Sequence, residues 1–161
     1  MLSRYFEDFP LGQRFDAGTV SVSEDEIIAF ARQYDPQPFH VDPVAARASI
    51  YGGLIASGWH TIALSMRLLI DHVFGHGGSM GSPGVDQIRW TRPVRPGDTL
   101  SVSTTVIEAR LSRSKPDRGV MRFRVDVHNQ HAEPVMELIG TSIMARRPTG
   151  PEQTSPEQTS S

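Results

Sequence analysis

Residues 51–58, Tyr-Gly-Gly-Leu-Ile-Ala-Ser-Gly, followed directly by WHTIALSMRLLIDHVF at residues 59–74, form the stretch that decides the fold. Apolar residues recur there at the three- and four-residue spacing of an α-helix. They are Trp59, Ile62, Ala63, Met66, Leu69, Ile70 and Val73, with Leu64, Leu68 and Phe74 widening the stripe. We therefore expect one long helix over residues 58–74, buried on most sides and ended by Gly75, a residue type common just past a helix.

The beginning of this helix is built of small residues. Gly52, Gly53 and Gly58 allow another molecule to approach the backbone. The free N–H groups of a first helical turn and the helix dipole favour negative charge, so such an end can stabilise an oxyanion. The same glycines also fit a tight turn with close packing, which is the commoner reason for any single glycine.

Around this helix the chain divides into a helical part and a β part. Upstream, a strand is expected at residues 18–22, a helix from Ser23 to about Gln33 with a Ser23/Glu26 capping box, and a short helix at 43–49. Downstream, alternating patterns predict strands at 85–90, 99–109, 120–129 and 135–146. Consecutive strands with short turns favour an antiparallel sheet, and the apolar helix needs that sheet to cover it. The pattern alone gives the α+β class.

The connection between the two upstream helices reads Asp35-Pro36-Gln37-Pro38-Phe39-His40-Val41-Asp42. Its prolines restrict the backbone, so the loop loses few conformations on ordering. In an extended chain Asp35 and His40 would point to opposite faces, so they meet only if the loop doubles back, and Asp-Pro favours a turn. The loop fits either an acid/base site or a plain helix connector. We interpret Asp42 as a helix N-cap because Pro43 follows it.

Taken together, these motifs resemble the MaoC-like dehydratases, the family that includes the (R)-specific enoyl-CoA hydratases and has the hot-dog fold. The family pattern Asp-x-Asn-Pro-x-His stands here as DPQPFH at residues 35–40, and the glycine-rich helix start as GGLIASG at 52–58. The opening YFEDF at 5–9 and RPVRPGD at 92–98 also fit. The motifs span roughly residues 4–146, and their combination is specific although each alone is weak.

The resemblance implies a hot-dog domain at residues 1–147, with a largely antiparallel sheet wrapped around one long central helix. Residues 148–161 are then a polar tail, in which Pro-Glu-Gln-Thr-Ser occurs twice without an apolar residue. Such a segment has nothing to bury, so we expect it to be disordered.

The same resemblance implies a hydro-lyase that hydrates trans-2-enoyl-CoA to (R)-3-hydroxyacyl thioesters, or catalyses the reverse dehydration, in fatty acid metabolism. Asp35 and His40 would be the catalytic pair, acting on one water. Gly58, through its N–H, and Ser57 would bind the thioester carbonyl. Gln37, which replaces the family's usual Asn, would support the water or the loop. No cofactor or metal is implied. A hot-dog acyl-CoA thioesterase, or a non-catalytic acyl-thioester-binding subunit, are alternatives.

Composition is compatible with this reading. The 161 residues suit one domain, and a net charge of −2 gives no reason to expect nucleic acid or membrane binding. There is no cysteine, hence no disulfide or thiol nucleophile, and no apolar run of transmembrane length or signal-peptide core, so we expect a cytoplasmic protein. The expected partner is an acyl-CoA or acyl-carrier-protein thioester. Long edge strands and an apolar flank predict a homodimer or larger homo-oligomer, and the resemblance to a family that dimerises implies the same.

Other polar residues have simpler explanations. His72 and His76 are four residues apart, but Gly75 should end the helix between them, so we expect no metal site. Arg89, Arg92 and Arg95 suit CoA phosphates chemically, since arginine binds phosphate well. Nothing in the sequence fixes the direction in which these arginines point, and surface strand charges are the preferred interpretation.

Overall fold

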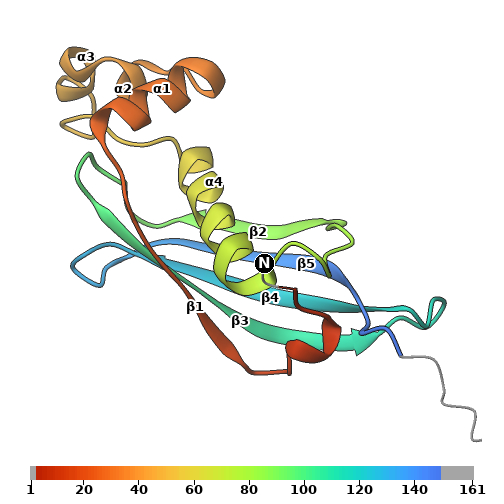
Figure 1. Ribbon diagram of the computed structural model, residues 1–161. Helices are drawn as coiled ribbons and strands as arrows, with labels where there is room; N and C mark the ends of the chain where they lie inside the picture. The colour runs from red at the N-terminus through yellow and green to blue at the C-terminus, as the bar shows by residue number, and fades with distance from the viewer. Residues whose placement is uncertain (1–2, 150–161) are drawn as a thin grey trace, which may run out of the picture.

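The structure, a computed structural model, describes residues 3–149. In chain order its elements are η1 (Phe6–Asp8), β1 (Arg14–Ser21), α1 (Glu24–Tyr34), α2 (Pro38–Val41), α3 (Pro43–Arg47), α4 (Gly58–Leu69), η2 (Ile70–Phe74), β2 (Gly84–Trp90), β3 (Thr99–Leu111), β4 (Arg118–His128) and β5 (Pro134–Ala145). The strands form one sheet in the order β1-β3-β4-β5-β2, and every neighbouring pair is antiparallel. Helix α4 lies across one face of that sheet (Figure 1). The expected α+β class is confirmed.

The core lies between α4 and the sheet. Strand β4 shows why, because its side chains alternate strictly between buried and half-buried positions, the period expected of a strand with one covered face. Its buried members are Met121, Phe123, Val125 and Val127, and Phe74 at the end of η2 packs on Phe123 with ring centroids 5.2 Å apart. The one long apolar helix is therefore covered by the sheet, as the sequence predicts.

Strand β1 begins at Arg14, four residues before the predicted start at Gly18. The glycine lies inside the strand, where the pairing with β3 is shifted by a bulge between Asp16 and Gly18. Its φ of 93° is a backbone conformation that residues with a Cβ rarely adopt. The prediction was wrong here because a glycine that accommodates a bulge was taken for a strand boundary.

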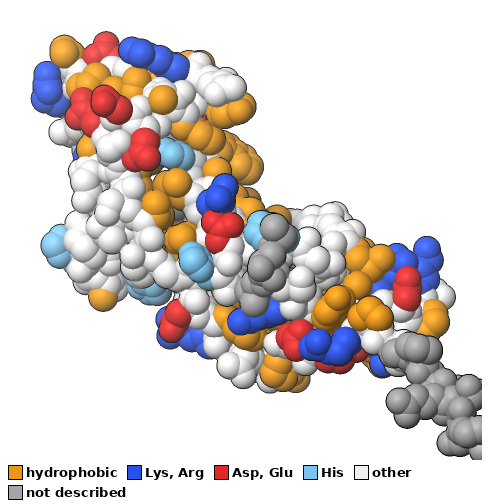
Figure 2. All heavy atoms as spheres, viewed as in Figure 1, with side chains coloured by type: hydrophobic (Ala, Val, Ile, Leu, Met, Phe, Trp, Pro, Cys, Tyr) orange, Lys and Arg blue, Asp and Glu red, His pale blue; other side chains and the backbone are white. Residues whose placement is uncertain are grey.

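The set of side chains that α4 buries differs from the prediction in part. The helix buries His60, Thr61, Ser65 and Leu69, while Trp59 is 57% and Met66 42% exposed. Hydrophobic side chains are visible on the surface along α4 (Figure 2). The predicted stripe is therefore divided. Trp59, Ala63 and Met66 are exposed, whereas the rest are buried in the core or packed against it: Ile62, Leu64, Leu68, Leu69, Ile70, Val73 and Phe74. Gly75 does end the helical stretch, with φ 71°, after a final π-helical turn.

Helices α1, α2 and α3 form a segment that projects beyond one end of the sheet, next to the beginning of α4 (Figure 1). The Ser23 hydroxyl accepts a hydrogen bond from Glu26 N, and the Glu26 carboxylate accepts one from Ser23 N, so the capping box is confirmed. Asp42 caps α3 through the N–H groups of Val44 and Ala45, as predicted.

Two expectations concern the limits of the chain. The tail expected at residues 148–161 lies almost wholly outside the described residues, so the boundary after residue 147 stays a prediction. Within residues 3–149, none of the helices combines the length and the hydrophobicity needed to cross a membrane.

Candidate active site

Asp35 and His40 are brought together by a sharp reversal of the chain after α1. Asp35 is the residue that ends α1, and its N–H still donates to Ala31 O. Pro36 prevents the helix from continuing, and the Asp35 carbonyl then accepts a hydrogen bond from Gln37 N at 2.8 Å. A single helical turn, α2, starts at Pro38 and carries His40 back toward Asp35. The expected doubling back is thus achieved by a helical turn that the proline-rich sequence did not predict.

The two side chains face one another. His40 Nε2 lies 3.3 Å from Asp35 Oδ2, and His40 Nδ1 lies 2.7 Å from the carbonyl oxygen of Ile55. A carbonyl only accepts, so Nδ1 carries a proton and donates it to Ile55. The imidazole is therefore held with Nε2 toward the carboxylate. His40 is only 4% exposed, and Nε2 is the imidazole nitrogen that this fixed orientation presents to Asp35.

Each oxygen of the Asp35 carboxylate is held by a neutral donor. Gln37 Nε2 donates to Oδ1 at 2.8 Å, and Ser57 Oγ donates to Oδ2 at 2.7 Å. Burial by itself raises the pKa of Asp35, but the hydrogen bonds from Gln37 and Ser57 and the nearby His40 charge outweigh it, so that the pKa lies below its ordinary value. The site therefore holds an ionised carboxylate at neutral pH.

Ser57 links this carboxylate to the central helix. It is the N-cap of α4, where its hydroxyl oxygen accepts a hydrogen bond from Trp59 N at 3.3 Å, and the residue is completely buried. Because the same hydroxyl donates its proton to Asp35, it is already engaged on both sides. The geometry thus gives Ser57 the task of fixing Asp35 at the start of α4.

Gly58, the first residue of α4, lies against the indole of Trp90 from the end of β2. Trp90 Nε1 donates to the Gly58 carbonyl at 3.2 Å. A Cβ placed on Gly58 would lie 2.3 Å from Trp90 Cε2, closer than real side chains approach. Among residues 3–149 the Gly58 N–H has no hydrogen-bond partner. Gly58 therefore combines a free donor at a helix beginning with a close-packed aromatic ring.

A cavity of about 470 Å³ opens beside these groups. Its walls come from the α1–α2 turn, the segment before α4, the first turn of α4 and the segment after β2. They consist of Asp35, Gln37, Phe39, His40, Tyr51, Ile55, Ala56, Gly58, Trp59, Thr61, Trp90, Thr91, Arg92, Pro93 and Val94. Trp59 and Trp90 meet edge to face, with ring centroids 5.6 Å apart. Every predicted site residue except Ser57 lines this cavity, and Ser57 lies behind Asp35.

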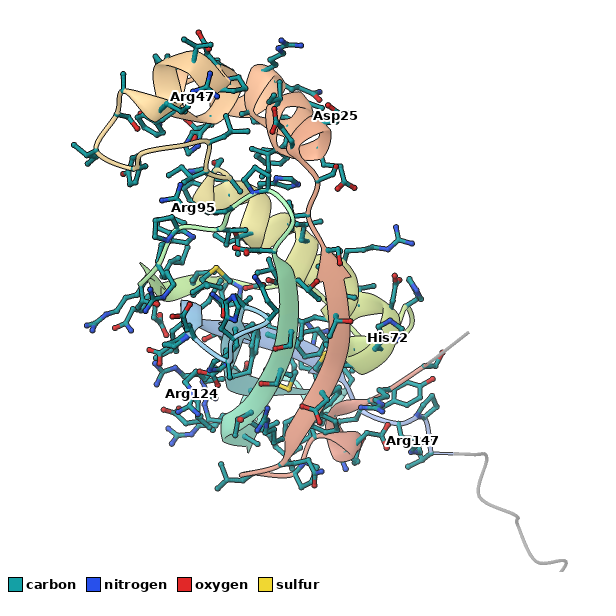
Figure 3. All side chains as sticks on the ribbon, turned by 90° about the vertical axis from the view of Figure 1, so that its left-hand side faces the viewer. Asp25, Arg47, His72, Arg95, Arg124 and Arg147 are labelled. Carbon is teal, nitrogen blue, oxygen red and sulfur yellow. The ribbon has the colours of Figure 1, made fainter. Side chains whose placement is uncertain are left out.

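The arginines between residues 89 and 95 separate into different roles. Arg92 lines the cavity. Arg95 donates through Nη2 to the carbonyl of Tyr51 at 2.5 Å, which ties the turn before β3 to the segment leading into α4. Figure 3 shows Arg95 beside the junction of the helical segment and the sheet, and Arg124 projecting from the sheet on the side away from α4. Only Arg92 of the three candidates remains available to a ligand of the cavity.

From the sequence, no metal site is expected at His72 and His76. His72 lies in η2 and His76 lies just after it, and His76 Nε2 is 3.8 Å from Asp71. In residues 3–149 no group of three or more His, Asp or Glu side chains is arranged to hold a metal ion.

Sequence reasoning missed two features of the site. The carbonyl of Ile55 orients His40, and Trp90 closes the wall beside Gly58. No sequence pattern indicates either contact, because each one joins two separate segments of the chain. Trp90 stands two residues before the Arg92–Asp98 motif, which was the only available signal.

Comparison with known proteins gives the site a context. The family model described as MaoC like domain matches residues 8–129. The MaoC-like dehydratase from Rhodospirillum rubrum is 42% identical, with a TM-score of 0.85 over 91% of this chain and 100% of that chain. The R-hydratase PhaJ1 from Pseudomonas aeruginosa is 28% identical, with a TM-score of 0.72 over 89% and 86% of the two chains.

A further likeness concerns the fold alone. The protein RV0216 of Mycobacterium tuberculosis, described as having a double hotdog fold, superposes with a TM-score of 0.79 at 20% identity, over 92% of this chain and 46% of that chain. The expected hot-dog fold is confirmed by this superposition.

Proposed function

The chain belongs to the family of MaoC-like domains, and from that premise we propose that it hydrates trans-2-enoyl thioesters to (R)-3-hydroxyacyl thioesters, or catalyses the reverse dehydration. The observation that carries the proposal is the Asp35–His40 pair, with Oδ2 and Nε2 3.3 Å apart on the wall of a 470 Å³ cavity. The similarity to the R-hydratase PhaJ1 favours the same reaction.

In the proposed hydration, a water bound between Asp35 and His40 attacks the β-carbon of the enoyl thioester. One O–H bond of the water breaks and its proton goes to the pair, while the new C–O bond pushes the alkene electrons toward the thioester carbonyl. A proton from the pair then forms the new C–H bond at the α-carbon. Nothing is oxidised or reduced, and the pair acts as a unit whose protons are shared.

The remaining site residues support this reaction. The Gly58 N–H points from the beginning of α4, where the helix dipole favours the enolate oxygen that develops during attack. Ser57 and Gln37 hold both oxygens of Asp35, so the carboxylate stays ionised and correctly oriented. The aromatic rings of Phe39, Tyr51, Trp59 and Trp90 give the cavity an apolar wall against which an acyl chain can pack.

We also propose that the protein works as a homodimer or larger homo-oligomer. Trp59 and Met66 on α4 are exposed, as are Val85 and Trp90 on β2, which is an edge strand of the sheet. Edge strands and apolar faces of this kind are usually covered by pairing. A monomer at micromolar concentration in light scattering would contradict this proposal.

The reaction is tested with purified protein and a panel of trans-2-enoyl-CoA and enoyl-acyl-carrier-protein thioesters. Loss of the alkene absorbance and chiral analysis showing the (R)-3-hydroxyacyl product are expected. Release of free thiol without hydration would indicate a thioesterase instead. Binding of the thioesters with neither reaction would indicate a non-catalytic acyl-thioester-binding subunit.

A further inference from the structure

Arg92 lines the cavity, and the proposed chemistry does not use its charge. Apart from His40, it is the only basic side chain among the described residues that line the cavity. Its side chain is also 49% exposed. A residue that both lines the cavity and reaches solvent lies where the cavity opens, which is the position a substrate crosses when it enters.

The backbone that carries Arg92 is anchored on both sides. Thr91 is tied to β5 and its start, because its N–H donates to Val135 O at 3.0 Å and its hydroxyl donates to Pro134 O at 2.8 Å. On the other side, the Val94 carbonyl accepts a hydrogen bond from Ala56 N at 2.8 Å. The position of Arg92 relative to the segment that leads into α4 is therefore fixed before any ligand arrives.

The guanidinium is oriented by Glu133. Arg92 Nε lies 3.5 Å from Glu133 Oε2, the oxygen that also accepts a hydrogen bond from Asn129 Nδ2 at 2.8 Å. Glu133 N in turn donates to Asn129 Oδ1, so the hairpin turn holds the carboxylate still. Within residues 3–149 the two terminal nitrogens of Arg92 have no protein acceptor. The contact through Nε thus leaves the fork of the guanidinium free.

The pair with Glu133 does not prevent Arg92 from binding a ligand. Both side chains are substantially exposed, and an exposed ion pair contributes about 0–1 kcal/mol. A bidentate contact between a guanidinium and a phosphate or carboxylate is stronger than this, because both partners are charged and the geometry matches. Glu133 therefore orients Arg92 through Nε, and a ligand oxyanion can bind the terminal nitrogens at the same time.

We propose that Arg92 binds an oxyanion of the substrate, remote from the reacting carbons. Two parts of a thioester substrate carry that chemistry: a phosphate of the CoA or carrier-protein arm, or a carboxylate at the far end of the acyl group. This inference rests on the proposed function, since it assumes that a thioester occupies the cavity. It makes Arg92 a residue that determines specificity.

The test measures binding rather than turnover, so it does not depend on hydration being observed. Calorimetry would compare butyryl-CoA, which carries phosphates, with butyryl-pantetheine, which carries no anion, and succinyl-pantetheine, which carries only a carboxylate. The proteins are the wild type, Arg92→Gln, Arg92→Lys and the matched control Arg89→Gln. Arg89 is an exposed residue of β2 that does not line the cavity.

The wild type should bind one of the two anionic thioesters about tenfold or more tightly than butyryl-pantetheine, as expected for a charge-assisted contact. Which of the two it prefers identifies the source of the oxyanion. Arg92→Gln should abolish the preference without weakening butyryl-pantetheine, Arg92→Lys should retain part of it, and Arg89→Gln should retain all of it. The inference is overturned if the wild type binds all three equally, or if Arg92→Gln weakens all three equally. Binding with the expected preference but no hydration would instead count against the proposed function alone.

Discussion

An aspartate and a histidine meet at each end of the central helix, and only one of these pairs has the surroundings of an active site. At the beginning of α4, Asp35 and His40 lie 3.3 Å apart, with side chains 19% and 5% exposed, on the wall of a cavity. At the far end, Asp71 and His76 lie 3.8 Å apart, and His76 is 46% exposed. The residue types are the same, so the difference must come from what holds them.

The two aspartates are stabilised by different partners. Asp35 accepts hydrogen bonds from two neutral donors, Gln37 and Ser57, which leaves its charge available to His40 and to a substrate. Asp71 accepts a hydrogen bond from Arg67 at 2.6 Å, and this contact is the main reason that the pKa of Asp71 is lowered. An arginine neutralises the carboxylate that it holds. The comparison teaches that neutral hydrogen-bond donors and enclosure distinguish the Asp35–His40 pair from the exposed Asp71–His76 pair.

The largest expected difference between the two ends is in activity. Asp35→Asn and His40→Gln should each reduce the hydration rate about 10²-fold or more, the usual scale for a positioned acid or base. Asp71→Asn and His76→Gln are the matched controls and should leave the rate unchanged. Steady-state kinetics with an enoyl-CoA, with circular dichroism to confirm folding, would measure both sets. Near wild-type rates in Asp35→Asn and His40→Gln would remove the catalytic assignment.

The double variant sharpens this prediction. Because both residues act on one water and its protons, combining Asp35→Asn with His40→Gln should cost much less than the sum of the two free-energy effects. Full additivity would mean that the two residues act in separate steps.

A smaller effect is expected from Gly58→Ala. The added methyl group would collide with Trp90, and overpacking of this kind costs about 1–3 kcal/mol of stability. The displaced indole should also disturb the Gly58 N–H and lower the rate. Chemical denaturation would measure the loss in stability, and the same substitution made in a Trp90→Ala background should cost little because the colliding ring is gone.

Gln37→Leu tests the neutral support of Asp35. It removes the donor to Oδ1, so the pKa of Asp35 should rise and the acidic limb of the kcat/KM profile should move to higher pH. A hydrogen bond to a charged group contributes about 1.5–3 kcal/mol, and its loss should act mainly on this pKa. The rate at neutral pH should fall less, because Asp35 stays ionised there. Gln37→Asn is the conservative control, because a shorter amide restores the donor in part. An unshifted acidic limb in Gln37→Leu would show that this amide only supports the loop.

Much of the fold could be predicted from the sequence. The features that could not be predicted depend on contacts that no local pattern encodes. The Ser23/Glu26 capping box, the stop at Gly75 and the strands after residue 84 depend on local signals, and the structure confirms them. The sequence predicted only that Asp35 and His40 would meet if the loop doubled back. It did not predict the helical turn that starts at Pro38 and brings them together.

The side of α4 that meets the sheet could not be predicted from the periodicity of its apolar residues. The helix is apolar on more than one side, and a pattern does not state which side meets the sheet of the same chain. The structure places Thr61 and Ser65 against the interior and leaves Trp59 and Met66 exposed. Likewise, the carbonyl of Ile55 that orients His40 is a backbone atom, and no residue type can signal its role.

The smallest expected effect is that of Asp71→Asn on stability. The pKa of Asp71 is lowered in the folded protein, so its contribution to stability is present above the pKa of the unfolded chain and is lost as the pH falls through the folded pKa. At pH 7 and low salt, Asp71→Asn should therefore lower the melting temperature slightly, and the difference from the wild type should disappear in acid. High salt should remove it as well, because the partner Arg67 is 80% exposed and exposed pairs are screened. Melting curves at two salt concentrations would show this. The loss of activity in Asp35→Asn should persist in high salt, because the contacts of that carboxylate lie in the cavity wall. If salt altered the two variants alike, the distinction between the enclosed pair and the exposed pair would be lost.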